Sequence, residues 1–283
     1  MKLKALPQLM RVENCAMAGI AVVVGFVVAG GNLTGLQSSV FSPGSPISGL
    51  LHAIISAFLI TGAGNAINDY YDRDADKKNA PKRPIPSKAI SAKAAFYVAI
   101  VLFGIGIAMS AFINISCLAL ASINSVLLFF YGRNLKSTVF TGNVAVSYLT
   151  ASTFVYGALV LSNPAATVFL ALLAFLANVG REIIGDVEDI TGDKKAGIMT
   201  FATKYGPNSS WLYGRAYIIA AVLLSPVPYL AGFLGLPYLA LVAAADALFI
   251  WSVATRDARM NQRLTKIAIL VGLLAFLVGA LIK

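Results

Sequence analysis

Long apolar runs recur from one end of this chain to the other, and they restrict its fold more than any other feature. A membrane-spanning helix needs about 20 mainly apolar residues, and runs of about 17 to 21 such residues are separated here by short polar joints. Charged residues make up 12% of the chain, whereas a soluble domain has about a quarter. These observations predict an all-α, polytopic membrane protein. Its predicted spans, nine in all, are about 12–30, 48–68, 94–112, 114–131, 143–161, 164–184, 212–232, 236–254 and 264–282.

The positive charges fall on alternate joints between these spans. All of the 22 Lys and Arg residues except Lys283 lie on one side of the predicted membrane. Because Lys and Arg are enriched in cytoplasmic loops, the pattern predicts a cytoplasmic N-terminus and a C-terminus outside. Topology and anionic lipid headgroups account for the net charge of +10, so the charge implies no nucleic-acid partner.

Two acidic segments share the spacing D-x-x-D-x-x-x-D-K-K, and each follows an apolar run. Residues with this spacing lie within an arc of roughly 60° on a helix, so each segment predicts an acidic stripe. The segments follow spans 2 and 6 and therefore emerge on the same side, which indicates two related four-helix halves plus a ninth helix. The alternative to a continuous second stripe is that Gly192 ends the second helix before Asp193. The stripes contain Asn65, Asp69, Asp72 and Asp76 in the first segment, and Glu182, Asp186, Asp189 and Asp193 in the second.

Six carboxylates in one cleft would repel one another. At a separation of about 5 Å and an effective dielectric constant of about 20, each like pair costs roughly 3 kcal/mol. Proton uptake, pairing with the adjacent lysines or binding of divalent cations would relieve this repulsion. Oxygen-only ligands suit Mg²⁺, which usually completes its coordination with phosphate oxygens. The pattern therefore predicts a site for a diphosphate with an apolar tail, at the membrane surface above a helix-lined cavity.

The segment Asn68–Asp76 reads N-D-x-x-D-x-x-x-D and is followed by Arg83-Pro84. It resembles the first signature of the UbiA superfamily of intramembrane prenyltransferases. The superfamily's second signature, D-x-x-x-D, is matched by Asp189 and Asp193. That family has nine helices around a central cavity and both motifs on the cytoplasmic side. The resemblance therefore covers the whole chain and implies a single transmembrane domain over 1–283, in the cell membrane, with a cytoplasmic active site.

The resemblance also implies roles for individual residues. Asp72, Asp76, Asp189 and Asp193 would be central to catalysis. Substrate would be bound by Asn14 at the start of the first span, by Asn65, and by Arg83 and Lys136, which would contact phosphate oxygens. Mg²⁺ would be held against the diphosphate by Asn68, Asp69, Asp72, Asp76, Asp186, Asp189 and Asp193.

Within the superfamily, Asn79–Ser87 and Arg181–Asp193 are most similar to the branch that makes archaeal-type ether lipids. This similarity implies transfer of a geranylgeranyl group from geranylgeranyl diphosphate to the free hydroxyl of 3-O-geranylgeranylglyceryl phosphate, through an allylic carbocation. One alternative is an aromatic prenyltransferase of quinone or haem biosynthesis. A more remote alternative is an ion-coupled transporter, which predicts broken helices at the membrane midplane, whereas both acidic segments lie at span ends.

A few other side chains also need an interpretation. Asp246 lies inside span 8, where it is either functional or a protonated carboxyl bonded to a neighbouring helix. Cys15 and Cys117 lie in apolar segments and are predicted to be packing residues, and the single histidine, His52, excludes a His-based metal site. Four tyrosines have two possible roles: they either line the cavity and shield a cation, or anchor the protein at the membrane interface. They are Tyr70, Tyr71, Tyr131 and Tyr148.

Overall fold

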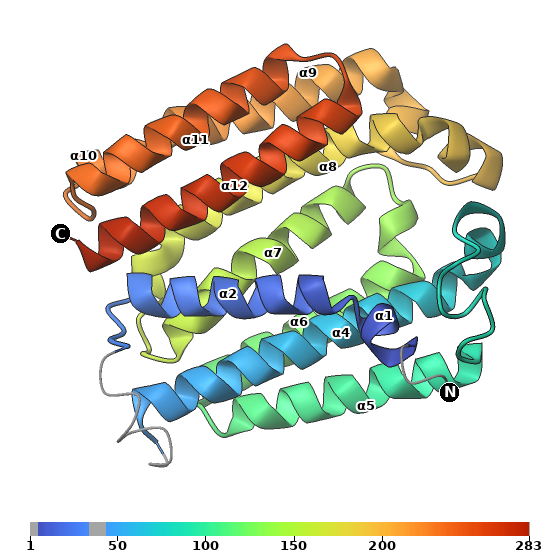
Figure 1. The fold of residues 1–283 in the computed structure, drawn as a ribbon, viewed down its shortest axis with the longest axis horizontal. Helices are drawn as coiled ribbons and strands as arrows, with labels where there is room; N and C mark the ends of the chain where they lie inside the picture. Colours follow the sequence, from blue (N-terminus) through green and yellow to red (C-terminus); the bar gives the residue numbers. More distant parts are fainter. Residues whose placement is uncertain (1–4, 34–43, 283) are drawn as a thin grey trace. The chain divides into compact units, whose positions relative to one another are not determined.

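The computed structural model describes residues 5–33 and 44–282, which form helices joined by short turns (Figure 1). Lys2, Lys4, Lys283 and most of the loop between predicted spans 1 and 2 lie outside the described residues. The described part of the chain contains no strand, so the predicted all-α class is confirmed. In chain order the helices are α1 (Ala5–Met10), α2 (Val12–Val28), α4 (Pro46–Asn79), α5 (Ala92–Ala111), α6 (Ile115–Arg133), the 3-10 helix η1 (Leu135–Ser137), α7 (Thr141–Leu159), the 3-10 helix η2 (Pro164–Thr167), α8 (Val168–Ala196), α9 (Phe201–Leu224), α10 (Val227–Leu230), α11 (Leu236–Ala254) and α12 (Ala258–Leu281).

In the described chain, 7 helices are long and apolar enough to cross a membrane, and each overlaps a predicted span. Helix α2 overlaps the first predicted span, but with 17 residues it is shorter than the about 20 that a span needs. Helix α7 overlaps the fifth, but polar side chains such as Asn143, Ser147 and Thr150 lower its hydropathy. A multi-pass membrane protein is therefore confirmed, whereas the predicted count of nine spans is not. The helices that qualify are α4, α5, α6, α8, α9, α11 and α12.

Helices α4 and α8 continue past the predicted ends of spans 2 and 6. Helix α4 has 34 residues, which at about 1.5 Å per residue is longer than the roughly 30 Å hydrocarbon core of a bilayer. Helix α8 has 29 residues and carries its acidic segment in the same way. The alternative in which Gly192 ends the second helix before Asp193 is wrong. The helix instead ends at Ala196, where Gly197 adopts the left-handed conformation with a φ of 69°.

The starts of several helices follow from local capping chemistry. The Ser45 side chain accepts a hydrogen bond from the Ser48 backbone N–H at 3.1 Å, and Pro46 stands at the first helical position of α4. Asn114 caps α6 by accepting from the Cys117 N–H at 2.8 Å. These caps satisfy backbone donors that have no partner inside the helix.

The described chain divides into two compact units. The main boundary follows Leu135, between predicted spans 4 and 5, where the repeat of acidic segments also placed a division. Each unit contains one acidic segment, on α4 in unit 1 and on α8 in unit 2. The single domain over 1–283 stays a prediction. Unit 1 comprises Met1–Phe26, Gly31–Leu135 and Val155–Pro164, and unit 2 comprises Val27–Gly30, Lys136–Phe154 and Ala165–Lys283.

In unit 1, α4 packs against α1, α5 and α6. The Ser56 hydroxyl of α4 donates to the Gly106 carbonyl of α5 at 2.7 Å, and a Cβ at Gly106 would lie 3.2 Å from the Ser56 carbonyl oxygen. Tyr156 in turn donates to the Ser56 hydroxyl at 2.9 Å. Small residues permit such close approach of membrane helices. These contacts fix the helix that carries the first acidic segment.

In unit 2, α8 packs against α9 and α12, and α11 packs against α12 (Figure 1). A Cβ at Gly180 of α8 would lie 2.5 Å from the Gly214 carbonyl of α9, so only glycine fits at this crossing. Ile184 and Ile218 pack in the apolar core beside it, together with Phe249 of α11. The second acidic segment therefore directly follows a tightly packed part of α8.

Asp246 of α11 is bonded to the end of a neighbouring helix. The Ser225 hydroxyl, at the C-terminal cap of α9, donates to Asp246 Oδ2 at 2.6 Å. Tyr238 donates to the Ser225 carbonyl at 2.6 Å. Of the two interpretations of Asp246, this geometry supports the one in which its carboxyl group joins two helices.

Candidate active site

The acidic segment of α4 turns one face into unit 1. Asp69 and Asp76 are only 2% and 6% exposed, and Asn65 on the same face is also buried. Asp69 and Asp76 are seven residues apart, which is about two helical turns and explains their shared environment. Asp72 is half-buried, whereas Asp74 points away and is exposed. Because carboxylates are almost never fully buried unless they are paired, the two buried aspartates require partners.

Two arginines from outside α4 supply these partners. Arg11 Nη2 lies 2.7 Å from Asp69 Oδ1, and Arg83 Nη1 lies 2.7 Å from Asp76 Oδ2. Arg83 Nη1 also lies 3.6 Å from Asp69 Oδ1, so both guanidinium groups approach one carboxylate. Arg83 was a predicted phosphate ligand, and the structure places it at the acidic face. The sequence pattern assigns Arg11 only to the basic residues that indicate topology.

The adjacent lysines do not neutralise this face, as far as the described side chains extend. Lys77 Nζ contacts Asp74 Oδ1 at 2.8 Å, on the exposed side of α4. Arg73 also reaches Asp74, at 3.8 Å, and its guanidinium lies over the Tyr70 ring at 4.8 Å. The side chain of Lys78 lies outside the described residues. The basic residues of this region therefore form two sets. One set pairs with Asp74 on the exposed side of α4, and the other pairs with the buried aspartates.

Asn68 provides an oxygen that fits a metal ligand. Its Oδ1 atom is buried and has no hydrogen-bond partner in the described structure. Gly132 of α6 makes room for it, because a Cβ at that position would collide with Asn68 Oδ1. An unpaired buried oxygen costs free energy, and Mg²⁺ takes such oxygens as ligands. Among the described residues no three Asp, Glu, His or Cys side chains converge on a metal position, so amide or phosphate oxygens would have to complete the coordination.

The other predicted substrate-binding residues have different surroundings. Asn65 donates to the Met10 carbonyl at 2.8 Å and so anchors the end of α1. Asn14 is exposed in the first turn of α2, and Lys136 is half-buried in η1. The binding roles of these three residues stay predictions.

In unit 2, Asp186 is held by two neutral donors. Asn143 Nδ2 of α7 lies 3.1 Å from Asp186 Oδ2, and the backbone N–H of Phe201 donates to the same oxygen at 3.2 Å. Phe201 is the first residue of α9, whose N-terminus favours negative charge nearby. Neutral donors orient a carboxylate without cancelling its charge. Both donors bind Oδ2, so Oδ1 of Asp186 is the carboxylate oxygen that neither of them occupies.

The remaining acidic residues of α8 continue along the same helix. Asp189 is exposed and Asp193 is half-buried, and both lie within α8, as the spacing predicted. Glu188 takes a different direction and accepts from Arg259 of α12 at 3.1 Å. The stripe of three aspartates on one continuous helix is therefore confirmed, whereas their role as metal ligands stays a prediction.

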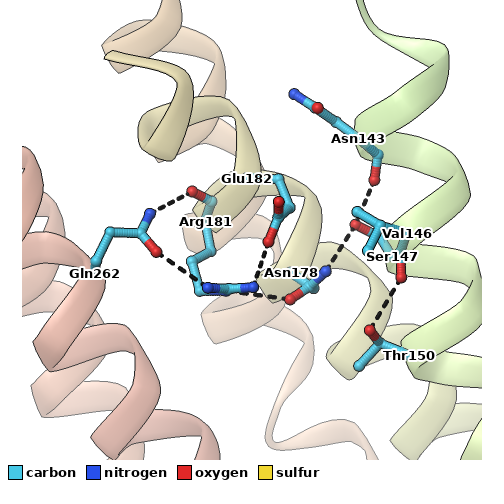
Figure 2. A network of polar contacts seen from close by, with 8 residues as sticks. All are labelled: Asn143, Val146, Ser147, Thr150, Asn178, Arg181, Glu182 and Gln262. Carbon is cyan, nitrogen blue, oxygen red and sulfur yellow. Dashed lines mark hydrogen bonds and ion pairs between the residues drawn. The ribbon is translucent and has the colours of Figure 1, made fainter. Parts of the chain in front are cut away.

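Figure 2 shows a polar network that fastens α8 to α12 and α7. Arg181 of α8 donates through Nη1 to Gln262 of α12 at 3.1 Å, and Gln262 donates back to the Arg181 carbonyl at 2.6 Å. The guanidinium also donates to Asn178 at 3.2 Å and pairs with Glu182. Because Arg181 already has three side-chain acceptors, it acts as a structural clamp in this geometry. Glu182, which shares its place in the repeat with Asn65, is the counter-ion of this clamp.

The same network continues to the acidic stripe. Asn178 donates to the Ser147 hydroxyl at 3.1 Å, and Ser147 donates to the Asn143 carbonyl at 2.6 Å (Figure 2). Asn143 in turn holds Asp186. Asn143 and Gln262 were not predicted from the sequence. The signal for Asn143 was a polar amide at the start of a predicted span, where such groups are usually functional or bonded to another helix.

Unit 1 also contains both cysteines, the histidine and most of the tyrosines that the sequence pattern singled out. Tyr70 and Tyr71 form an edge contact with ring centroids 5.1 Å apart, and Tyr70 also contacts Phe96. Cys15 and Cys117 are buried free thiols, as predicted. The His52 ring nitrogen Nδ1 lies 2.7 Å from the Ser48 carbonyl of its own helix.

Known proteins match this chain over most of its length. The model of the UbiA prenyltransferase family matches residues 20–277. A protein of Methanopyrus kandleri named digeranylgeranylglyceryl phosphate synthase is 42% identical over 284 residues, which cover 99% of this chain and 100% of that protein. The family match covers most of the chain and therefore shows its family. The second match shows that the chain is similar to an enzyme named digeranylgeranylglyceryl phosphate synthase.

Solved structures show the same fold. One, on the biosynthesis of digeranylgeranylglyceryl phosphate synthase in membranes, has a TM-score of 0.80 and 35% identity, covering 99% of this chain and 98% of its own. A UbiA homologue from Archaeoglobus fulgidus bound to GPP and Mg²⁺ has a TM-score of 0.66 and 16% identity, covering 96% of this chain and 99% of its own. At 16% identity the second likeness shows the fold alone. The predicted UbiA-type fold is confirmed.

Proposed function

The chain belongs to the UbiA prenyltransferase family, and from this premise we propose that it forms the second ether bond of archaeal-type membrane lipids. It transfers a geranylgeranyl group from geranylgeranyl diphosphate to the free hydroxyl of 3-O-geranylgeranylglyceryl phosphate. The observation that carries the proposal is the 42% identity, over 99% of the chain, to a protein named digeranylgeranylglyceryl phosphate synthase. The paired acidic segments and the cationic groups beside them support it.

The proposed ligands of the Mg²⁺-bound diphosphate come from the acidic segments of α4 and α8. When bound, Mg²⁺ neutralises the negative charge that grows on the departing diphosphate. In the described structure the buried Oδ1 of Asn68 has no hydrogen-bond partner, which supports its role as a ligand. Both neutral donors of Asp186 bind Oδ2, which supports Oδ1 as its ligand atom. The proposed ligand set is Asn68, Asp69, Asp72, Asp76, Asp186, Asp189 and Asp193.

The chain's own cations assist departure of the diphosphate. Arg83 and Lys136 donate to phosphate oxygens, where the charge increases as the bond between carbon 1 and oxygen breaks. An allylic carbocation remains, and the acceptor hydroxyl forms the new carbon–oxygen bond. The hydroxyl proton goes to a carboxylate of the site or to the departing diphosphate. Since the cation forms before an aliphatic hydroxyl attacks, the reaction needs no strong general base.

The proposed site lies on the cytoplasmic side of the cell membrane, with the N-terminus cytoplasmic and the C-terminus outside. The distribution of Lys and Arg over alternate joints supports this orientation. Both substrates carry long apolar chains, which a multi-pass helical protein can hold within the bilayer while their charged groups reach its surface.

An acceptor panel tests the proposal. Purified protein is incubated with Mg²⁺, radiolabelled geranylgeranyl diphosphate and, separately, the glyceryl phosphate ether, a hydroxybenzoate or a hydroxynaphthoate. We expect labelled product from the glyceryl phosphate ether. Transfer to an aromatic acceptor, with none to the ether lipid, would assign the chain to quinone or haem biosynthesis. Absence of prenyl transfer to every acceptor would instead favour a transporter.

A further inference from the structure

We propose that Arg11 binds the phosphate of the acceptor, so that it selects the phosphorylated ether lipid. This inference rests on the proposed function, which supplies two substrates that each carry a phosphate group. The structure places two guanidinium groups along the buried face of α4, with Arg83 at Asp76 and Arg11 at Asp69. Arg83 also lies 3.6 Å from Asp69, so the two guanidinium groups are neighbours at this carboxylate. The buried face thus offers two neighbouring guanidinium groups for two anionic substrates.

The turn between α1 and α2 holds Arg11 in a rare conformation. Arg11 has a φ of 51°, in the left-handed region that few residues other than glycine adopt. The preceding Met10 carbonyl, freed where α1 ends, accepts from Asn65 Nδ2 at 2.8 Å and from the Cys15 thiol at 3.2 Å. Leu9 and Met10 are buried beside it. Such a backbone persists only where its surroundings enforce it, which often occurs at functional sites.

The Arg11 side chain retains capacity for a second anion. Its contact with Asp69 uses Nη2, and a guanidinium has five N–H donors in a planar fork that matches phosphate oxygens. The Arg11 side chain is 33% exposed, whereas the Asp69 side chain is 3% exposed. Asp69 therefore anchors one edge of the guanidinium from inside the protein while another edge remains accessible. This arrangement suits a cation that is held in place before its ligand arrives.

The other basic residues of this region are less suitable. Arg73 and Lys77 are drawn to Asp74 on the exposed side of α4. Arg83 contacts both buried aspartates and is the proposed ligand of the leaving diphosphate. An acceptor phosphate beside that diphosphate would be repelled without a cation of its own. Arg11 is the second guanidinium that the described structure places on the acidic face.

The test compares two acceptors that differ only in the phosphate. Wild type and Arg11→Gln are assayed with 3-O-geranylgeranylglyceryl phosphate and with 3-O-geranylgeranylglycerol. For the phosphorylated acceptor, we expect Arg11→Gln to raise KM by about 10- to 100-fold, as for the loss of a charge-assisted phosphate contact. The KM for geranylgeranyl diphosphate and the rate with the unphosphorylated acceptor should change by less than about 3-fold. Arg73→Gln, on the outer side of α4, is the matched control and should leave all three values unchanged.

Binding provides a second readout that does not require catalysis. Radiolabelled 3-O-geranylgeranylglyceryl phosphate is titrated into wild type, Arg11→Gln and Arg11→Lys without donor or Mg²⁺. We expect Arg11→Gln to bind at least about 10-fold more weakly and Arg11→Lys to be intermediate, because lysine keeps the charge but loses the fork. The lysine variant also serves if the glutamine variant does not fold.

Each other outcome would contradict the role of Arg11 in a different way. If KM rises for the donor alone, Arg11 serves the diphosphate instead. If activity falls equally with both acceptors, Arg11 only holds Asp69 in place. If wild type uses the phosphorylated acceptor and Arg11→Gln is unaffected, the inference fails while the proposed function stands. If wild type does not prenylate the phosphorylated acceptor at all, the proposed function fails and this inference fails with it.

Discussion

Asn143 Nδ2 lies 3.1 Å from Asp186 Oδ2 and joins α7 to the acidic stripe of α8. Together with the Phe201 N–H, it occupies Oδ2 of the carboxylate, and neither donor binds Oδ1. A neutral donor in this position fixes the orientation of a carboxylate and preserves its charge, as outer partners of metal ligands do. Asn143 is therefore a positioning residue for Asp186.

Loss of this donor should weaken metal activation. We expect Asn143→Ala to reduce the rate by about 10-fold and to raise the Mg²⁺ concentration for half-maximal activity, because outer partners of ligands are worth about 10- to 100-fold. Asn143→Asp should be more severe, since it places a like charge beside Asp186. The control is Thr150→Ala, an exposed residue of α7 that bonds within its own helix. An unchanged Mg²⁺ dependence in Asn143→Ala would contradict the positioning role.

The clamp between Arg181 and Gln262 should contribute to stability. Gln262→Ala removes an acceptor from the Arg181 guanidinium and a donor from the Arg181 carbonyl. We expect the free energy of unfolding to fall by about 1–3 kcal/mol, since both groups are partly buried. Thermal unfolding in detergent would measure this loss. Arg263→Ala, exposed at the next position, should have little effect, and equal melting temperatures for the two variants would rule out the clamp.

The predicted topology can be checked by labelling. Ser87 follows the first acidic segment and Ser162 follows α7, and both are exposed. In a background without Cys15 and Cys117, Ser87→Cys should react from the cytoplasmic side and Ser162→Cys from outside, because basic joints mark the cytoplasmic face. Labelling of both cysteines from the same side would overturn the orientation.

The proposed order of bond breaking predicts a strong effect of fluorine in the donor. A fluorine near carbon 1 of the prenyl chain destabilises the carbocation, so the rate should fall by at least about 100-fold, or about 2.7 kcal/mol of barrier. The comparison requires saturating donor, so that binding differences do not contribute. A rate that is insensitive to fluorine would show that the hydroxyl attacks before the diphosphate departs.

The local features of this fold could be predicted from the sequence. The length of the apolar runs located the helices, and the spacing of Asp69, Asp72 and Asp76 placed them along one side of a helix, because both features depend on residues close in the chain. The end of α8 was not fixed by the sequence pattern. Gly192 indicated a helix end, but α8 continues to Ala196, since an isolated glycine costs only about 1 kcal/mol in a helix.

The partners of the acidic residues could not be predicted. Arg11 is 58 positions from Asp69, and Asn143 is 43 positions from Asp186, so these contacts depend on how helices pack. Arg11 also depends on a left-handed turn for which the sequence provides no glycine. In the same way, the sequence offered Lys77 as a partner for the stripe, but the structure pairs it with Asp74 on the outer side.

The central claim is that the acidic segments of α4 and α8 act together in one Mg²⁺-dependent prenyl transfer. The most direct measurement is the rate of transfer from geranylgeranyl diphosphate to 3-O-geranylgeranylglyceryl phosphate in wild type, Asp72→Ala, Asp189→Ala and Asp74→Ala, with and without EDTA. We predict that EDTA abolishes wild-type activity and that Asp72→Ala and Asp189→Ala each lower it by at least about 100-fold, because each loses stabilisation of the leaving diphosphate. Asp74→Ala, on the exposed side of α4, should remain near wild type. Near-normal activity of either Asp72→Ala or Asp189→Ala, or activity that survives EDTA, would contradict the account.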